Sequence, residues 1–481
     1  MMILCVFLIL NKRVFYVQKN FPTLRKLILL VGDISATVVA TYLAVNVIFI
    51  FMPEQANMKI YYDMMPVNVI LMGMLFNVYG LFSLKKKRYG EIFLGILISV
   101  FYSLVIMMAI SFFLREFAYS RSVLLLTAIG QLFLLNFWQY SMWRIEMMLS
   151  APQRALIIGN QEEALRVLAR LSISPQLKYE VSYVSTDSSS DEWKEVIYTI
   201  DLIIICSDLP LKKKEDIVNF CQQLDKQVLL MPSVYELFCS GLEIDKIDDI
   251  PFFQPKYLKL TLEKRSLKRI VDLIISSLAI ILLSPIMALL AIAIKLDSKG
   301  PILYSQVRTG RYENEFKVYK FRSMKQDAEK KSGPVMAQKQ DTRITKVGKF
   351  IRATRLDELP QLFNVLMGDM SIVGPRPERP FFVKQFKKEI PEYLYRHNVK
   401  PGITGMAQVY GKYNTTVYDK LIYDLMYIQK CDLFMDFVIM IQTVRVLLMK
   451  SSTEGVSEST GKHGVRNNLK KYRIKEDLKK T

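Results

Sequence analysis

The segment KRSLKRIVDLIISSLAIILLSPIMALLAIAIKLDSK, residues 264–299, determines how the rest of the chain must be arranged. Its apolar part, residues 270–296, exceeds the roughly 20 residues that cross a bilayer. Basic residues flank both ends, which favours keeping both ends in the cytoplasm. Ser284-Pro285 interrupts the middle, where proline removes a helix hydrogen bond and the serine hydroxyl can satisfy the freed carbonyl. The pattern predicts a re-entrant helix that dips into the membrane and returns, in preference to a fifth straight span.

After this segment, residues 300–450 form a soluble-looking block rich in Lys, Arg, Gly and Pro. Its last part, residues 432–448, is apolar but interrupted by charged and amide side chains. We expect this stretch to lie on the membrane interface, although a helix of the domain core would show the same pattern. Residues 451–481 are polar and basic and are predicted to form a disordered tail.

Ahead of the segment, residues 1–150 contain four apolar stretches long enough to span a bilayer. They cover residues 27–52, 64–84, 92–114 and 122–149. The opening run, residues 1–10, is too short to span and has no small-residue cleavage site behind it. Basic residues precede the first stretch and separate the second from the third, which places these regions in the cytoplasm. The sequence therefore predicts a multi-pass membrane protein whose remaining chain is cytoplasmic.

Between the spans and the re-entrant segment, residues 151–251 alternate short apolar runs with polar helical stretches. This alternation is typical of a small, Rossmann-like parallel α/β domain. Strands are predicted at residues 155–159, 202–206 and 228–231, and a helix at residues 162–171. Gly159 is not followed by the further glycines of a dinucleotide fingerprint. A regulatory or assembly domain is therefore a better interpretation than a nucleotide-binding one.

Composition restricts the chemistry. Hydrophobic residues make up 51% of the chain and the mean hydropathy is +0.20, which points to membrane segments. The net charge of +20 fits both positive flanks of membrane helices and a basic face for diphosphates and anionic lipid. The five cysteines show no CxxC spacing and are expected to be unpaired cytosolic thiols. With only two histidines, the chain has few candidate residues for a His-based zinc site or a Ser-His-Asp triad.

Basic side chains gather in clusters between residues 300 and 405. Guanidinium groups match phosphate oxygens bidentately, so these clusters suit a diphosphate. A lone basic patch is more often a solvated surface. Residues 374–379, Gly-Pro-Arg-Pro-Glu-Arg, are predicted to form a stiff turn whose two arginine side chains point in the same direction. The residues expected to bind substrate phosphate are Arg308, Lys320, Arg322, Arg343, Arg352, Arg376 and Arg379.

Asp357 and Glu358 admit two interpretations. Asp357 has the features of an ordinary N-cap for a helix that runs to Met367 and stops at Gly368. A helix N-terminus also binds phosphate, and a carboxylate surrounded by arginines stays ionised and can attack phosphorus. Since adjacent helix residues point in different directions, one carboxylate can act as nucleophile while the other holds a metal ion. Oxygen ligands and a diphosphate substrate favour Mg²⁺.

Several motifs in order resemble the bacterial sugar transferase family, the monotopic polyprenyl-phosphate glycosyl-1-phosphate transferases. They are Arg322-Ser323-Met324, Asp357-Glu358-Leu359-Pro360-Gln361, Asn364-Val365, Gly368-Asp369-Met370-Ser371, Val373-Gly374-Pro375-Arg376-Pro377 and Lys400-Pro401-Gly402-Ile403-Thr404-Gly405. The resemblance covers residues 264–448 and implies a catalytic domain over residues 262–450. The spans and the α/β domain resemble the large form of the family, which starts exopolysaccharide or capsule repeat units.

The resemblance implies a two-step reaction on the cytoplasmic face of the bacterial inner membrane. The aspartate at Asp357 attacks the β-phosphate of a UDP-sugar, UMP leaves, and the phosphosugar passes to undecaprenyl phosphate. Glu358 matches the partner carboxylate, Arg376 a phosphate-binding arginine, and Ser284-Pro285 the break in the re-entrant helix. Mg²⁺ is the implied cofactor. A cytosolic nucleotide substrate also supports the re-entrant interpretation of residues 270–296.

Two departures affect the expected sugar contacts but not the phosphate chemistry. Residues 311–314 lack a second glycine that many relatives have, and Met406 replaces an aromatic residue. The alternative enzyme class, a membrane-anchored nucleotide-sugar dehydratase or epimerase, would need a dinucleotide glycine loop and a Tyr-x-x-x-Lys pair. The sequence contains neither, so this alternative is the weaker one. A non-catalytic scaffold explains the front half but not the carboxylates and arginines behind it. The sequence leaves open which sugar is used and whether the α/β domain forms a homodimer; membrane lipid is an expected partner and nucleic acid is not.

Overall fold

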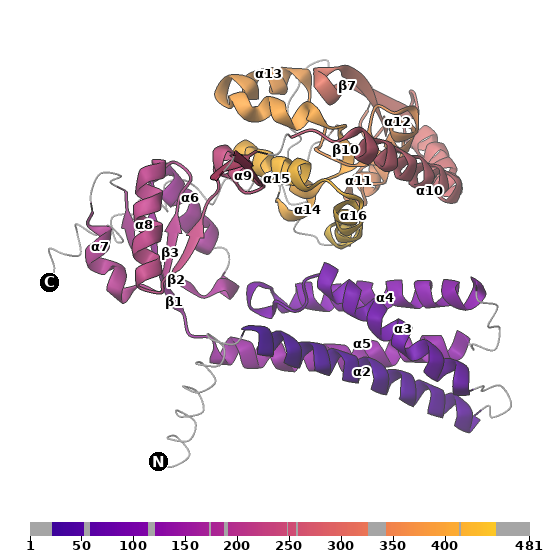
Figure 1. The fold of residues 1–481 in the computed structure, drawn as a ribbon. Coiled ribbons are helices and arrows are strands. Elements are labelled where there is room, and N and C mark those ends of the chain that lie inside the picture. The colour runs from indigo at the N-terminus through magenta and orange to yellow at the C-terminus, as the bar shows by residue number, and fades with distance from the viewer. Residues whose placement is uncertain are drawn as a thin grey trace, which may run out of the picture. The chain divides into compact units, whose positions relative to one another are not determined.

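The computed structural model describes residues 22–51, 58–113, 121–172, 175–186, 191–247, 249–255, 258–325, 343–412 and 415–448. The chain divides into two compact units, with the boundary between Met231 and Pro232 (Figure 1). Residues 232–251 are therefore part of the second unit. The predicted tail at residues 451–481, the opening run at residues 1–10 and the ends of two predicted spans at Met52 and Leu114 lie outside the described residues.

The first unit begins with helices at each of the four predicted spans. They are α2 (Pro22–Phe51), α3 (Met58–Val78), α4 (Tyr89–Phe113) and α5 (Arg121–Leu149). Helix α5 packs along α2 and α4, while α3 contacts the same two helices (Figure 1). Within the described residues, α2, α4 and α5, together with α10 of the second unit, are long and apolar enough to cross a membrane. Asp63 and Asn68 lower the hydropathy of the shorter helix α3.

Buried polar side chains join these helices in pairs. The Gln139 side-chain amide of α5 donates to both carboxylate oxygens of Asp33 on α2, at 2.8 and 2.9 Å. The Ser103 hydroxyl of α4 donates to the side-chain oxygen of Asn68 on α3 at 2.7 Å. Interhelical hydrogen bonds of this kind specify which helices associate in an apolar solvent.

The α/β part of the first unit is a parallel sheet with the strand order β2-β1-β3-β4. Its strands are β1 (Gln153–Ile158), β2 (Tyr179–Ser185), β3 (Leu202–Ile205) and β4 (Gln227–Leu230), and its helices are α6 (Gln161–Ser172), α7 (Trp193–Val196) and α8 (Leu211–Gln223). The predicted parallel sheet, its three strands and the helix at residues 162–171 are confirmed. Strand β2 was not predicted because its sequence, YEVSYVS, mixes polar and apolar residues and has no continuous apolar run.

The second unit is mostly helical. Its helices are α9 (Val234–Cys239), α10 (Leu262–Asp297), α11 (Lys346–Ala353), α12 (Gln361–Met367), α13 (Pro380–Glu389), α14 (Met406–Tyr410), α15 (Val417–Lys430) and α16 (Leu433–Leu448). The hairpins β5 (Glu243–Ile247)–β6 (Ile250–Gln254) and β7 (Leu303–Thr309)–β8 (Glu315–Phe321) are antiparallel, whereas β9 (Ser371–Val373) and β10 (Gly402–Thr404) pair in parallel.

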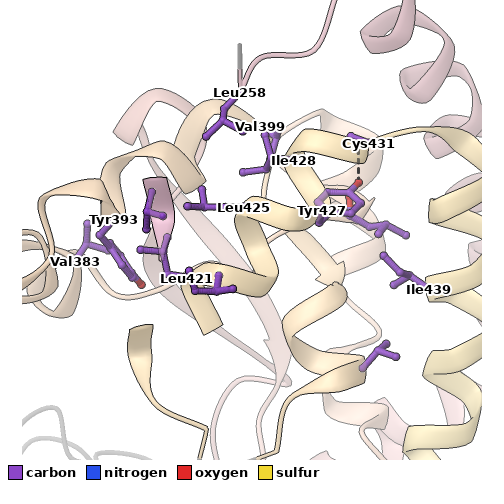
Figure 2. Close-up of a cluster of buried hydrophobic side chains, with 14 residues drawn as sticks. Leu258, Val383, Tyr393, Val399, Leu421, Leu425, Tyr427, Ile428, Cys431 and Ile439 are labelled. Atoms are coloured by element: carbon purple, nitrogen blue, oxygen red, sulfur yellow. Dashed lines mark hydrogen bonds between the residues drawn. The ribbon is translucent and has the colours of Figure 1, made fainter. Parts of the chain in front are cut away.

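Helix α15 forms the centre of the main core of this unit. Its residues Leu421, Leu425 and Ile428 recur at helical spacing and are buried against residues from the surrounding segments (Figure 2). Helix α16 adds Ile439, which is fully buried, while Phe434 on the same helix is 68% exposed. The stretch at residues 432–448 is therefore a core helix on one side and an exposed apolar surface on the other.

Helix α10 is continuous from Leu262 to Asp297 and contains Pro285. The Ser284 hydroxyl donates to the Ile281 carbonyl at 2.8 Å. That carbonyl lies four residues before Pro285 and is the one that proline, lacking an N–H, leaves without a helical donor. The predicted interruption is thus a missing hydrogen bond within one helix, compensated by serine, and not a gap between two helices.

Candidate active site

The Asp357–Glu358 pair lies in a single 3₁₀ turn, Leu356–Glu358, which we call the catalytic turn. Arg355 enters the turn in the left-handed conformation, with φ of 58°. Helix α12 begins only at Gln361, with Pro360 at its N-cap and no side-chain cap, so the ordinary N-cap interpretation of Asp357 is wrong. The predicted stop at Gly368 is confirmed by its φ of 100°.

Glu358 accepts hydrogen bonds from two cations that come from distant segments. Its Oε1 lies 2.8 Å from Lys320 Nζ at the end of β8 and 2.6 Å from Arg376 Nη2 in the Gly-Pro-Arg-Pro turn. Burial would raise the pKa of Glu358, but the charges and hydrogen bonds of Arg376 and Lys320 outweigh it and hold the pKa well below its usual range. The structure thus brings together three of the predicted site residues.

The environment of Asp357 shifts its pKa in the opposite direction to that of Glu358. Burial and the neighbouring charge of Glu358 raise the pKa of Asp357, although Lys320, Arg352 and Arg355 act in the other direction. Within the described residues its carboxylate accepts no hydrogen bond. Two cations of the site, Lys320 and Arg376, are paired with Glu358, and the role of Asp357 as nucleophile stays a prediction.

Arg308 contacts the turn that carries Arg376. Its Nη1 donates to the Pro377 carbonyl at 3.0 Å and lies 3.5 Å from a Glu378 carboxylate oxygen. The backbone supports the same contact, since Thr309 N donates to Glu378 O at 2.9 Å. Arg308 therefore ties strand β7 to the Gly-Pro-Arg-Pro turn.

The remaining predicted phosphate-binding residues lie on neighbouring elements. Arg352 is in the last turn of α11, and Arg379 precedes α13 as its N-cap residue. The Arg343 carbonyl accepts from Lys325 N at 2.9 Å. Arg322 is only 6% exposed and donates to carbonyls at the C-terminal end of α10, so it does not join the group around Glu358. A phosphate-binding role for these four residues stays a prediction.

A buried ion pair that sequence reasoning missed supports Arg376. Arg396 and Asp424 are 6% and 2% exposed, and their side chains lie 2.8 Å apart. Arg396 Nη2 also donates to the Arg376 carbonyl at 2.9 Å. An aspartate within the apolar stretch of α15 was the available signal, because a buried carboxylate is paired in folded proteins.

Two glycine-containing motifs meet through their backbones. Gly402 N donates to Pro375 O at 2.9 Å, and Gly374 N donates to Thr404 O at 2.8 Å. A Cβ atom at Gly374 would lie 2.4 Å from Lys400 O, and one at Gly402 would lie 2.1 Å from Gly374 N. Only glycine fits at both positions, and this approach sets the start of the turn that presents Arg376.

The two carboxylates differ in how free they are to hold the predicted Mg²⁺. Both Glu358 oxygens already face cationic donors, with Oε1 accepting from Lys320 and Arg376 and Oε2 at 3.4 Å from Arg376 Nη1. Elsewhere in the described residues, three acidic and thiol groups of the α/β domain are spaced closely enough to hold a metal ion: Glu163, Cys206 and Asp208. Asp357 accepts no hydrogen bond among the described residues, and Mg²⁺ binding by the pair stays a prediction.

The features above define a membrane-associated protein with a cluster of cations around two neighbouring carboxylates. The family model for bacterial sugar transferases matches residues 263–450, from the start of α10 to just beyond α16. Over 314 residues the chain is 36% identical to the UDP-glucose:undecaprenyl-phosphate glucose-1-phosphate transferase of Klebsiella pneumoniae, covering 61% of this chain and 67% of that protein. The chain therefore belongs to the bacterial sugar transferase family.

Two further relatives match shorter parts of the chain. The UDP-N-acetylgalactosamine-undecaprenyl-phosphate N-acetylgalactosaminephosphotransferase of Aeromonas hydrophila is 48% identical, over 38% of this chain and 44% of its own length. An exopolysaccharide production protein of Rhizobium leguminosarum is 41% identical, over 37% of this chain and 93% of its own length. The match thus spans less than half of the Aeromonas protein and nearly all of the Rhizobium one.

Proposed function

We propose that this protein transfers a sugar-1-phosphate from a UDP-sugar to undecaprenyl phosphate and releases UMP. The observation that carries the proposal is the difference in environment between two adjacent carboxylates. Glu358 is paired with Lys320 and Arg376, and Asp357 has no hydrogen-bond partner among the described residues. The names of the relatives, which refer to UDP-sugars and undecaprenyl phosphate, support the substrate classes. The reaction would be the first membrane step of exopolysaccharide or capsule repeat-unit synthesis.

In the first step, an Asp357 carboxylate oxygen attacks the β-phosphorus of the UDP-sugar. A new carboxylate oxygen–phosphorus bond forms, the bond from the β-phosphorus to the bridging oxygen breaks, and UMP leaves with that electron pair. The product is an aspartyl-phosphosugar. A carboxylate with a raised pKa is more basic, and one without hydrogen bonds needs no partner displaced, so Asp357 is better suited than Glu358 to be the nucleophile.

In the second step, a phosphate oxygen of undecaprenyl phosphate attacks the same phosphorus. The bond to Asp357 breaks, the carboxylate is regenerated, and the lipid-linked diphosphate sugar is released. Lys320 and Arg376 are held by Glu358 before substrate arrives, so their donors are already placed for the charge that develops on the phosphoryl oxygens. Preorganisation of this kind avoids reorienting charged groups during the reaction.

We further propose that α10 enters and leaves the membrane on the cytoplasmic side. The basic residues at both of its ends and the internal Pro285, which removes a helical hydrogen bond, support this topology. It places the catalytic turn at the headgroup level of the inner membrane, where cytosolic UDP-sugar and the phosphate of the lipid carrier meet.

The experiment that tests the chemistry uses the full chain in membranes and UDP-sugars labelled in the β-phosphate. The panel contains UDP-glucose, UDP-galactose and the two N-acetylhexosamine forms. Without lipid acceptor, the correct UDP-sugar should give a burst of UMP and hydroxylamine-labile label on the protein; adding undecaprenyl phosphate should move the label to lipid. UMP release that occurs only with acceptor, and no bound label, would disprove the aspartyl-phosphosugar intermediate.

A further inference from the structure

The part of α10 that follows Pro285 shares one apolar cluster with the catalytic turn. A buried apolar cluster contains Leu290, Ile294, Phe321 and Ile351. Leu356 and Leu359, which flank the Asp357–Glu358 pair in sequence, pack against this cluster. One core therefore joins the membrane helix, the end of strand β8, helix α11 and the catalytic turn.

Arg322 binds the C-terminal end of the same helix. Its Nη2 lies 2.6 Å from Ser298 O, 2.9 Å from Ser298 Oγ and 3.3 Å from Ile294 O. Its Nη1 donates to Lys299 O at 3.1 Å. The last carbonyls of a helix have no helical donors, and a cation there also interacts favourably with the helix dipole. With 6% exposure, Arg322 is committed to this contact.

Arg322 also continues the strand that carries Lys320. Strand β8 ends at Phe321, and Arg322 N donates to the Ile302 carbonyl at 2.9 Å, next to the start of β7. A further link leaves the same end of α10, because the Asp297 carboxylate accepts from Val347 N in the first turn of α11 at 3.0 Å. The end of α10 is thus bonded to the elements on both sides of the catalytic turn.

We propose that Arg322 is a positioning residue that fixes the second half of α10 against strand β8, and that it does not bind the substrate phosphate. Through this contact it holds Lys320 in reach of Glu358 and keeps the catalytic turn on its apolar support. The proposal rests on the proposed transferase function for its kinetic consequence, whereas its structural consequence can be measured without turnover.

The kinetic test compares the full-length wild type with Arg322→Lys in membranes, following UMP release. Lysine keeps the charge but cannot reproduce contacts with two carbonyls from one planar group. We expect kcat to fall about a hundredfold, as for a small displacement of catalytic groups. The KM for the UDP-sugar should stay within about twofold, because no substrate contact is removed. A KM increase with kcat retained would show that Arg322 binds substrate and would overturn the proposal.

Lys295→Ala is the matched control. Lys295 lies in the last turn of α10, and its Nζ donates to Gly300 O at 3.2 Å without any bond to β8. Removing this cation should leave kcat and KM unchanged. An equal loss of kcat in this variant would mean that charge at the helix end matters and that the link to β8 does not, which also overturns the proposal.

The structural test measures hydrogen–deuterium exchange on purified full-length protein in detergent. Arg322→Lys should accelerate exchange in peptides covering residues 294–299 and 318–322 but not in helix α6 of the first unit. Unchanged exchange at both peptides would overturn the proposal, and so would acceleration throughout the chain, which would indicate general destabilisation. Absence of UMP release from the wild type would contradict the proposed function, while the exchange result would still decide whether Arg322 fixes α10.

Discussion

The Arg376 guanidinium meets the Glu358 carboxylate at two points, with Nη2 2.6 Å from Oε1 and Nη1 3.4 Å from Oε2. The same Oε1 accepts from Lys320 at 2.8 Å. One carboxylate therefore sets the positions of two cations that come from a strand and from a turn. This arrangement makes the planar shape of the arginine as important as its charge.

Arg376→Lys should lower kcat/KM for the UDP-sugar about a hundredfold, the cost of losing one preorganised donor in a site of this kind. Lysine keeps the positive charge beside Glu358 but offers no two-point contact to carboxylate or phosphate. UMP release from purified enzyme measures the effect. Full activity in this variant would mean that the Gly-Pro-Arg-Pro turn has only a structural role.

Asp357→Asn should abolish UMP release and at the same time stabilise the fold at neutral pH. Because the folded state raises the pKa of Asp357, it binds this proton more tightly than the unfolded chain, so stability is lost as pH rises above the ordinary aspartate range. The amide removes that cost. The thermal midpoint of the variant should exceed that of the wild type at pH 7, and the two should converge near about pH 3. Residual turnover well above background would refute the nucleophile assignment.

His397 should stay neutral throughout the physiological pH range. Burial and the adjacent charge of Arg396 lower its pKa to about 4, and its Nδ1 lies 3.2 Å from the Gly310 carbonyl, which fixes Nδ1–H as the donor. The folded state then binds this proton less tightly than the unfolded chain, so stability falls as pH drops from about 6.5 toward 4.

Nitrogen-15 spectra of histidine-labelled protein can check this assignment, since the chain has only two histidines. In a His463→Gln background the single remaining signal should titrate near pH 4. His397→Gln, which keeps a donor for Gly310 O, should remove the matching part of the acid-side loss of stability. A midpoint near 6.5 would contradict the buried, neutral assignment.

Both ends of α10 should be inaccessible from outside the cell. Single cysteines at the exposed positions Ser266 and Leu296, in a background without the native cysteines, should resist an impermeant thiol reagent in intact cells and react once the inner face is opened. Leu296 is chosen because it is 83% exposed and, unlike Ser298, does not contact Arg322. Labelling of Leu296→Cys from outside would establish a true span.

Replacing Ser284-Pro285 with Ala-Leu should shift some molecules toward a spanning form. Leucine restores an N–H donor to the Ile281 carbonyl, which the Ser284 hydroxyl now satisfies, and so favours a straight helix. The cysteine at residue 296 should then become partly labelled from outside, with UMP release reduced in proportion. Unchanged labelling with unchanged activity would show that this pair does not set the topology.

Sequence reasoning selected the central residues of the site but not all of their partners. Asp357, Glu358 and Arg376 stand in short motifs whose residue types point to phosphate chemistry, and Lys320 shares the group around Glu358. Arg322 is two residues from Lys320 yet bonds to carbonyls more than twenty residues upstream. Charge density in a sequence does not show which cation faces which acceptor, because that depends on tertiary packing.

The missed elements have physical reasons of the same kind. Strand β2 has the sequence YEVSYVS, whose glutamate and serines interrupt any apolar run. The Arg396–Asp424 pair joins residues 28 positions apart, and neither belongs to a recognisable motif. By contrast, β1, β3 and β4 were predictable because they are runs of aliphatic residues bounded by polar turns.

The backbone contact between Gly374 and Gly402 also limits how this protein can diverge. Neither position accepts a side chain, so a lineage that changes one of them cannot be rescued by changing the other. Residues 375–401 between them include α13, whose Phe381 is 62% exposed. A substitution at an exposed position such as Phe381 therefore meets less steric constraint than one at either glycine, where the chain sets the start of the turn that presents Arg376.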